Sequence, residues 1–226
     1  MEHLGIRILF QGNNFLRLLG GLWISLRIAG ISMILSIVLG IFMGLIMTSK
    51  KKTIRFLSRL YLEVVRIMPP LVLLFLVYFG AAKHWKVNLS GDMAAVIVFT
   101  FWGAAEMGDL VRSALESIPI HQLHSGVALG MTRNQVYQFI LIPQIFKRLL
   151  PSVMNLLTRM IKTTSLVVLI GVVEVVKVGK QMIDASRFAI PDAALWVYGA
   201  IFILYFAACY PFSRASALFE KKLRDS

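Results

Sequence analysis

The sequence predicts an all-α membrane protein that crosses the membrane about five times and forms one domain over residues 1–226. Apolar residues make up 58% of its 226 residues and charged residues only 15%, whereas an ordinary soluble domain is about 45–50% apolar. A helix needs about 20 residues to cross a hydrocarbon core about 30 Å thick. Five apolar stretches meet this need, at residues 18–47, 61–82, 93–111, 149–168 and 193–212. No linker rich in Pro, Gly or Ser divides the chain.

The placement of the basic residues predicts the orientation of the chain. A net charge of +13 would suggest nucleic-acid binding in a soluble protein, but here the basic residues gather beside the apolar stretches. They are Lys50, Lys51, Lys52, Arg55 and Arg59 in the first connection, and Arg214, Lys221, Lys222 and Arg224 near the C-terminus. Because cytoplasmic loops carry an excess of Lys and Arg, we expect the N-terminus outside and the C-terminus in the cytoplasm.

The first stretch contains residues that a lipid-facing helix does not need. Gly40 and Gly44 have the spacing that lets another helix approach closely, either for packing within the chain or for a contact between subunits. Arg27 lies far from the cytoplasmic end. Its side chain is expected either to extend to the outer interface or to face a polar cavity.

The second stretch is interrupted by two adjacent prolines, Pro69 and Pro70. Proline removes a helix hydrogen bond and crowds the preceding turn, so we expect a break there. Irregular backbone is tolerated at membrane depth only where protein or a water-filled cavity covers it. Just before the break, Arg66 stands three residues after Glu63, and this spacing favours an ion pair between them.

Charged residues with matching spacing occupy the third and fourth stretches. Glu106 and Asp109 stand three residues apart in the third, one turn after Trp102. Arg159 and Lys162 have the same spacing in the fourth. A carboxylate facing lipid costs about 2.5–3.5 kcal/mol. The two pairs therefore either neutralise each other in a structural seam or contact a substrate, and both roles stay open.

Residues 118–143 form the longest interval after residue 93 that does not resemble a lipid-embedded helix. A short helix is expected first, poor in side-chain bulk, so that another protein's surface can approach it. Its small residues are Ser125, Gly126, Ala128 and Gly130. Gly130 accepts the left-handed conformation that ends a helix, and Thr132 and Gln135 form the capping box of a second helix. An ordinary amphipathic loop between spans fits the same pattern.

The end of this interval carries a resemblance that favours a protein-docking role. Gly130 is followed, after nine residues, by the sequence Ile140, Leu141, Ile142 and Pro143. This resembles the second half of the cytoplasmic signature of inner-membrane permease subunits of ABC importers. In that family the signature opens with Glu-Ala-Ala, and its short helix docks into a cleft on the ATPase subunit. Here the opening residues are His124, Ser125 and Gly126.

Other segments resemble the polar amino-acid permeases of that family. The corresponding positions are Arg66 and Pro69 at the break, Asp109 (in place of the usual Glu) and Arg112 in the third stretch, Asn155 and residues 162–166 (with Thr163 in place of the usual Asp) in the fourth, and Gly171, Val172 and Glu174 after it. The resemblance covers nearly all of the chain from Leu19 onward. It implies a permease subunit of a binding-protein-dependent type I importer, which moves a polar amino acid across the bacterial inner membrane by alternating access.

The resemblance also implies partners and site residues. The partners are an ATPase dimer, a second permease that is identical or paralogous, and an extracellular or periplasmic binding protein. No catalytic residue, metal or cofactor is expected in this chain, and ATP and Mg²⁺ belong to the ATPase. The expected substrate contacts are Trp102, Glu106, Asn155, Arg159, Lys162, Thr163, Thr164 and Ser165. The expected ATPase contacts are Pro119, Leu123, His124, Ser125, Gly126, Val127 and Gly130.

Two other classes of function compete with the importer. An ion-coupled secondary amino-acid transporter would use Glu106, Asp109, Arg159 and Lys162 as a proton relay, and a membrane scaffold subunit would transport nothing. Neither accounts for the cytoplasmic signature. The substrate stays open among glutamine, a basic amino acid, cystine and other sulfur-containing amino acids. His124 in place of an acid suggests a diverged half that pairs with a different permease chain.

Overall fold

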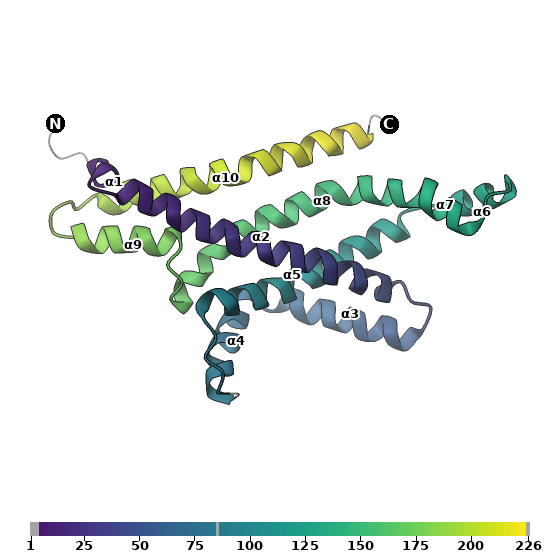
Figure 1. Ribbon diagram of the computed structural model, residues 1–226, viewed down its shortest axis with the longest axis horizontal. Helices are drawn as coiled ribbons and strands as arrows, with labels where there is room; N and C mark the ends of the chain where they lie inside the picture. The colour runs from purple at the N-terminus through teal and green to yellow at the C-terminus, as the bar shows by residue number, and fades with distance from the viewer. Residues whose placement is uncertain (1–4, 85, 225–226) are drawn as a thin grey trace. The chain divides into compact units, whose positions relative to one another are not determined.

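The computed structural model describes residues 5–84 and 86–224, and the described chain is built from helices joined by short connections (Figure 1). The helices are α1 (Arg7–Phe10), α2 (Asn14–Met47), α3 (Lys52–Ile67), α4 (Pro70–His84), α5 (Gly91–Glu116), α6 (His121–Ala128), α7 (Arg133–Val136), α8 (Ile142–Thr163), α9 (Val175–Ser186) and α10 (Ala193–Arg224). A π-helical turn, η1 (Tyr137–Leu141), joins α7 to α8, and a 3₁₀ segment, η2 (Thr164–Ile170), follows α8.

Within the described part of the chain, four helical stretches are long and apolar enough to cross a membrane. They are Asn14–Met47, Gly91–Glu116, Arg133–Ile170 and Ala193–Leu223. Helices α3 and α4 qualify together as one broken span. The prediction of an all-α protein with about five spans is therefore confirmed. The side of the membrane on which each terminus lies stays a prediction.

The second predicted span, residues 61–82, lies within a longer pair of helices. Helix α3 begins at Lys52, and α4 continues to His84. Hydropathy locates the apolar part of a helix and misses its amphipathic part, which here carries the basic residues. The break itself lies at Met68 and Pro69, as the two prolines indicate. The backbone amide of Met68 still donates to the Val64 carbonyl oxygen, 3.1 Å away, so the interruption takes only two residues.

The chain divides into two compact units that cut across the long helices. The first comprises Met1–Met33, Pro69–Phe99 and Arg159–Pro211, and the second comprises Ile34–Met68, Thr100–Thr158 and Phe212–Ser226. The outermost residues of both ends lie outside the described part. The single domain expected over residues 1–226 stays a prediction.

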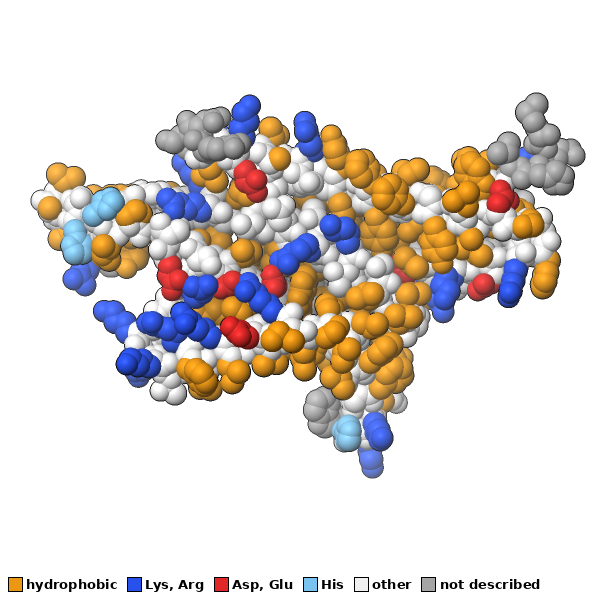
Figure 2. Space-filling model, turned by 180° about the vertical axis from the view of Figure 1, so that it is seen from behind, with side chains coloured by type: hydrophobic (Ala, Val, Ile, Leu, Met, Phe, Trp, Pro, Cys, Tyr) orange, Lys and Arg blue, Asp and Glu red, His pale blue; other side chains and the backbone are white. Residues whose placement is uncertain are grey.

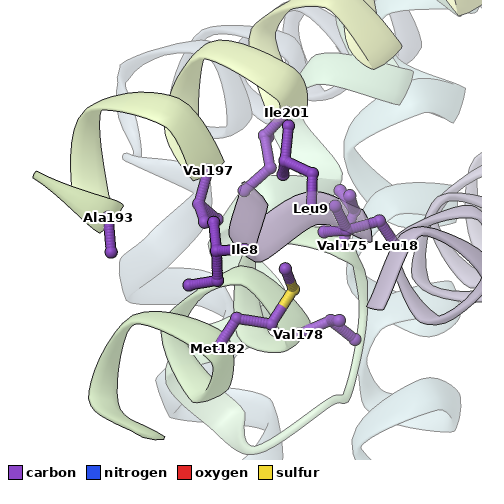
Figure 3. Packing of buried hydrophobic residues seen from close by; sticks show 9 residues of the cluster. All are labelled: Ile8, Leu9, Leu18, Val175, Val178, Met182, Ala193, Val197 and Ile201. Carbon is purple, nitrogen blue, oxygen red and sulfur yellow. The ribbon is translucent and has the colours of Figure 1, made fainter. Parts of the chain in front are cut away.

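The apolar core of the first unit gathers α1, α9 and the beginnings of α2 and α10 (Figure 3). It consists of Ile8, Leu9, Leu18, Val175, Val178, Met182, Ala193, Val197 and Ile201. Helix α1 has four residues, too few for an isolated helix to persist in water, so burial of Ile8 and Leu9 stabilises it. Gly179 brings α9 against α10, because a Cβ there would lie 2.5 Å from Ile201 Cδ1.

In the second unit, the close contact of α2 with α5 depends on the glycine pair. A Cβ on Gly40 would lie 2.5 Å from the Cβ of Met107, and one on Gly44 would lie 2.5 Å from the Cβ of Val111. Ser36 Oγ, further back on α2, donates to the Thr100 carbonyl oxygen at 3.3 Å. The partners advance along both helices together, so α2 and α5 run in the same direction. Of the two roles open for Gly40 and Gly44, the structure shows packing within the chain.

Candidate functional site

Helix α6 ends in a compact stop at Gly130. The backbone of Gly130 is left-handed, with φ at +86°, where a side chain would cost about 1–2 kcal/mol. Its amide donates to the Val127 carbonyl oxygen at 3.0 Å, and the amide of Met131 donates to the Gly126 carbonyl oxygen at 3.1 Å. This pair of bonds is the Schellman motif, which satisfies carbonyl groups that a helix end leaves unpaired.

The next helix begins at once with the predicted capping box. The Thr132 amide donates to Gln135 Oε1 at 2.8 Å, and the Gln135 amide donates to Thr132 Oγ1 at 3.4 Å. Because α7, η1 and α8 follow without an intervening loop, the stop is joined directly to a membrane-spanning helix. The predicted succession of helix, stop and helix is confirmed. A displacement of α6 therefore has a short, hydrogen-bonded route to α8.

The predicted ATPase contacts divide into exposed and inward residues. The exposed ones are Pro119, His124, Ser125, Val127 and Gly130, and Figure 2 shows histidine and apolar side chains on the surface of α6. Leu123 is half-buried and lines a cavity of about 380 Å³ beside α6 together with Pro119 and Tyr137. The outer face of α6 is thus available to a partner.

Gly126 has a different role from the one expected. It is buried, and a Cβ there would lie 2.6 Å from Val136 Cγ2. The missing side chain lets α7 pack on α6 within the chain, so Gly126 offers no surface to another protein. The sequence could not show this, because the position of α7 depends on the direction in which the chain leaves Gly130.

A cluster of ion pairs joins α3 to α5 in the second unit. Asp109 lies between Arg66 Nη2, at 2.5 Å, and Arg112 Nη2, at 2.6 Å. Arg66 Nε also reaches Glu106 Oε1, at 3.4 Å, and Arg112 reaches Glu116 at 2.5 Å. Both inner carboxylates are nearly covered, with 12% and 13% of their side chains exposed. Figure 2 shows the acidic and basic side chains intermixed over this region.

The expected pair between Arg66 and Glu63 is wrong. Among the residues that the structure describes, the ion pairs of Arg66 are with Glu106 and Asp109. Glu63 is exposed on α3, and no ion pair joins it to another residue in the described part of the chain. A covered carboxylate left unpaired costs several kcal/mol. The guanidinium therefore turns toward α5. The expected seam from Glu106 or Asp109 to Arg159 or Lys162 links the two units and stays a prediction.

The predicted substrate residues on α5 are largely covered. Trp102 is 8% exposed and contributes apolar packing one turn before Glu106. The Glu106 side chain is nearly covered, and its carboxylate faces Arg66. Any ligand amine that approached Glu106 would therefore compete with a guanidinium that is already in place.

The predicted substrate residues on α8 form an exposed polar stripe. Asn155, Arg159 and Lys162 are all exposed, and their spacing of four and three residues places them on one helix face. This face presents two cations and an amide. The stripe is therefore accessible in the described chain.

The hydroxyl groups that follow the stripe already donate hydrogen bonds to their own helix. Thr163 Oγ1 donates to the Arg159 carbonyl oxygen at 2.8 Å, and Ser165 Oγ donates to the Lys162 carbonyl oxygen at 2.9 Å. Such a hydroxyl keeps its lone pairs and can only accept from a ligand. These hydroxyls therefore suit an ammonium. Thr164 is fully buried and donates to the Ile161 carbonyl oxygen at 2.7 Å.

Sequence reasoning missed the structural role of Glu174. Its carboxylate accepts from the amides of Val176 and Lys177, both at 2.9 Å, and lies 3.4 Å from the hydroxyls of Ser25 and Tyr205. It therefore caps α9 from a fully buried position. Burial raises the pKa of Glu174. An acid directly before an amphipathic run was the signal that could have revealed the cap.

The partner of Arg27 was also missed. Arg27 forms an ion pair with Asp92 in the first turn of α5. From the sequence we expected either the outer interface or a polar cavity around Arg27 and named no acidic partner. The two residues are 65 positions apart, and only the parallel packing of α2 and α5 brings them together.

Comparison with known proteins places the chain in a family. Residues 36–225 match the family described as "Binding-protein-dependent transport system inner membrane component". The chain is 30% identical over 216 residues to the "Probable amino-acid permease protein YxeN" of Bacillus subtilis, covering 95% of this chain and 94% of that protein. It is 32% identical over 204 residues to the "Probable amino-acid ABC transporter permease protein PatM" of Vibrio harveyi, covering 89% of each.

Solved structures have the same fold. A structure described as "Crystal structure of an amino acid ABC transporter with histidines" superposes with a TM-score of 0.80 at 25% identity, over 91% of this chain and 94% of that one. An inward-facing structure of the MetNI methionine ABC transporter superposes with a TM-score of 0.68 at 16% identity, over 91% and 97%. The second likeness concerns the fold alone. With its multi-pass helices and its α6 stop, the chain belongs to the family of binding-protein-dependent transport system inner membrane components, as a non-catalytic transmembrane subunit of an ABC importer whose ATPase is a separate subunit.

Proposed function

We propose that this subunit carries a polar amino acid across the bacterial inner membrane by alternating access, driven by an ATPase dimer that docks on α6. The printed names of YxeN and PatM, and the amino acid transporter with a TM-score of 0.80, support the substrate class. The observation that carries the proposal is the chemistry of α8. Its exposed stripe offers cations and acceptor oxygens, which match the two charges of an amino acid.

The α8 stripe assigns one role to each end of the substrate. Arg159 and Lys162 are exposed, and a guanidinium or ammonium forms charge-assisted hydrogen bonds with a carboxylate. Thr163 and Ser165 donate to the helix backbone, so their oxygens accept from the substrate ammonium. Asn155 extends the stripe by one turn and can bond a polar side chain. Trp102, Glu106 and Thr164 belong to the proposed surroundings of the substrate.

The proposed coupling uses the exposed face of α6. His124, Ser125 and Val127 are exposed on it, and Leu129 at its end is 83% exposed. Ile120, at 69%, is also exposed in the same segment, and several exposed apolar side chains together are typical of a protein contact. Because the Schellman motif and the capping box hold the connection rigid, movement of α6 would be transmitted to α8. ATP and Mg²⁺ would be bound by the ATPase.

The remaining partners are a binding protein that delivers the substrate and a second permease, identical or paralogous. Transport then needs two states in which the site makes different contacts with the substrate. The break at Met68 and Pro69 is one place where the backbone can change between states. Proline has no N–H group, so Pro69 holds no helix hydrogen bond that would have to break.

The test is uptake by the complete importer in proteoliposomes, with the ligand first identified by mass spectrometry of the cognate binding protein. Lys162→Ala should lower uptake about tenfold or more, because a hydrogen bond to a charged group contributes about 1.5–3 kcal/mol. Lys180→Ala removes an equally exposed lysine from α9 and should leave uptake unchanged. The ATPase should co-purify with both variants. Normal uptake by Lys162→Ala would contradict the proposed site.

A further inference from the structure

A groove between α2 and α5 in the first unit combines an apolar wall with an ion pair at one end. Its volume is about 360 Å³, within the usual range for small-molecule sites. The wall consists of Ile28, Ile31, Met93, Val96 and Ile97, and the pair is Arg27 with Asp92. Ile31, Met93 and Ile97 are 44%, 57% and 46% exposed, so the groove opens outward along the helices.

The length of α2 places this ion pair at the level of the lipid headgroups. Helix α2 ends at Met47, directly before the basic connection. The 20 residues from Arg27 to Met47 rise about 30 Å, the thickness of the hydrocarbon core. Asp92 is the second residue of α5 and marks the same boundary. The charged end of the groove therefore faces headgroups, and its apolar wall faces acyl chains.

The ion pair leaves hydrogen-bonding capacity on both residues. The bond joins Arg27 Nη2 to Asp92 Oδ2, and the side chains stay 49% and 40% exposed. Among the described residues, the structure gives no other hydrogen bond to either side chain. Arg27 thus has donors left for a phosphate, and Asp92 has an acceptor oxygen left for an ammonium.

We propose that this groove binds a zwitterionic aminophospholipid of the phosphatidylethanolamine type. The phosphate lies on Arg27, the primary ammonium donates to Asp92, and one acyl chain lies along Ile31 and Ile97. The charges of the site match those of this headgroup. The Arg27–Asp92 pair is neutral overall, so it does not attract a net anion or a net cation. It does complement a headgroup that carries both a phosphate and an ammonium. Phosphatidylcholine has no ammonium N–H to donate, and phosphatidylglycerol has no cation for Asp92.

The experiment is native mass spectrometry of the complete importer after purification from nanodiscs that contain equal amounts of phosphatidylethanolamine, phosphatidylcholine and phosphatidylglycerol. We expect one phosphatidylethanolamine per copy of this chain, retained at least tenfold over either competitor. Arg27→Gln should abolish this preference. Arg17→Gln removes a charge from the same helix, where Arg17 bonds Gln181 at 2.8 Å, and should keep the preference.

Three further variants separate lipid binding from a purely structural ion pair and from a subunit contact. Ile97→Trp fills the groove and leaves both charges, so it should also release the lipid. Asp92→Asn should remove the preference over phosphatidylglycerol. Equal retention of the three lipids, or retention unchanged by Ile97→Trp, would overturn the proposal. Capture of the second permease through Ile97→Cys, with no lipid retained, would also overturn it and identify the groove as a subunit contact.

Discussion

The ion pairs around Asp109 predict a specific loss of stability when its charge is removed. Asp109→Asn leaves a side chain of the same size but removes the carboxylate that lies 2.5 Å from Arg66 and 2.6 Å from Arg112. A hydrogen bond to a charged group contributes about 1.5–3 kcal/mol. Arg66 is 45% exposed and Arg112 is 22% exposed, so water recovers part of this and we expect a net loss of about 2 kcal/mol.

The assay is thermal unfolding of the purified importer, with Arg66→Gln, Asp109→Asn and the double variant forming a mutant cycle. A loss of about 2 kcal/mol corresponds to about 4–8 °C for a chain of this size. The cycle should show a coupling energy of about 1 kcal/mol or more, since the two residues are in contact. Glu63→Gln is the control, because Glu63 is exposed and has the spacing of a partner for Arg66. A coupling of Arg66 with Glu63, or none with Asp109, would refute the described geometry.

Three more predictions rest on local geometry. Gly44→Leu should destabilise the protein by about 1–3 kcal/mol through overpacking against Val111, measured by thermal unfolding, whereas Gly20→Leu on the same helix has open space and should be nearly silent. Gly130→Ala should cost about 1–2 kcal/mol at its left-handed backbone and reduce co-purification of the ATPase, and undiminished recovery would count against a rigid stop. Glu174→Gln tests the raised pKa of a buried acid: the wild type should lose stability relative to the variant as the pH rises from about 4 through the raised pKa, and a constant difference in melting temperature would contradict it.

The sign of the last prediction follows from proton linkage. A carboxyl whose pKa is higher in the folded than in the unfolded protein binds more protons when folded. Its favourable contribution is therefore complete below the pKa of the unfolded state and is lost as the pH rises through the raised pKa. Glutamine mimics the neutral form at every pH, so the difference between the two proteins isolates this residue.

Local patterns were predictable from the sequence. The capping box of Thr132 and Gln135 and the stop at Gly130 depend only on residues within one or two turns, and both were found where expected. The break at Pro69 has the same local origin. The number of spans followed from hydropathy, because each helix must satisfy its backbone hydrogen bonds internally in lipid.

Residue partners across helices were not predictable in the same way. Arg66 pairs with Glu106 and Asp109 because α3 packs on α5. Spacing along the sequence indicated only Glu63, which is nearer in the chain. The contact of Gly126 with Val136 was not predictable either, because it depends on how α7 packs on α6. The hydrogen bonds that Thr163 and Ser165 donate to carbonyl oxygens of their own helix were not predictable either, because they depend on side-chain rotamers. Each error concerns a side-chain direction that composition and spacing leave undetermined.

Helix α6 is the segment proposed to receive force from the ATPase. Cys209 is the only cysteine in the sequence, so Leu129→Cys in a Cys209→Ser background places a single thiol at the exposed end of α6. A reagent that carries a maleimide and a photoactivated benzophenone, added to inverted membrane vesicles and irradiated, should cross-link this thiol to the ATPase subunit, and Phe188→Cys, at a site that is 98% exposed beyond α9, should give no such product. Absence of the product at position 129, with that thiol labelled instead by an impermeant reagent from outside intact cells, would contradict the account.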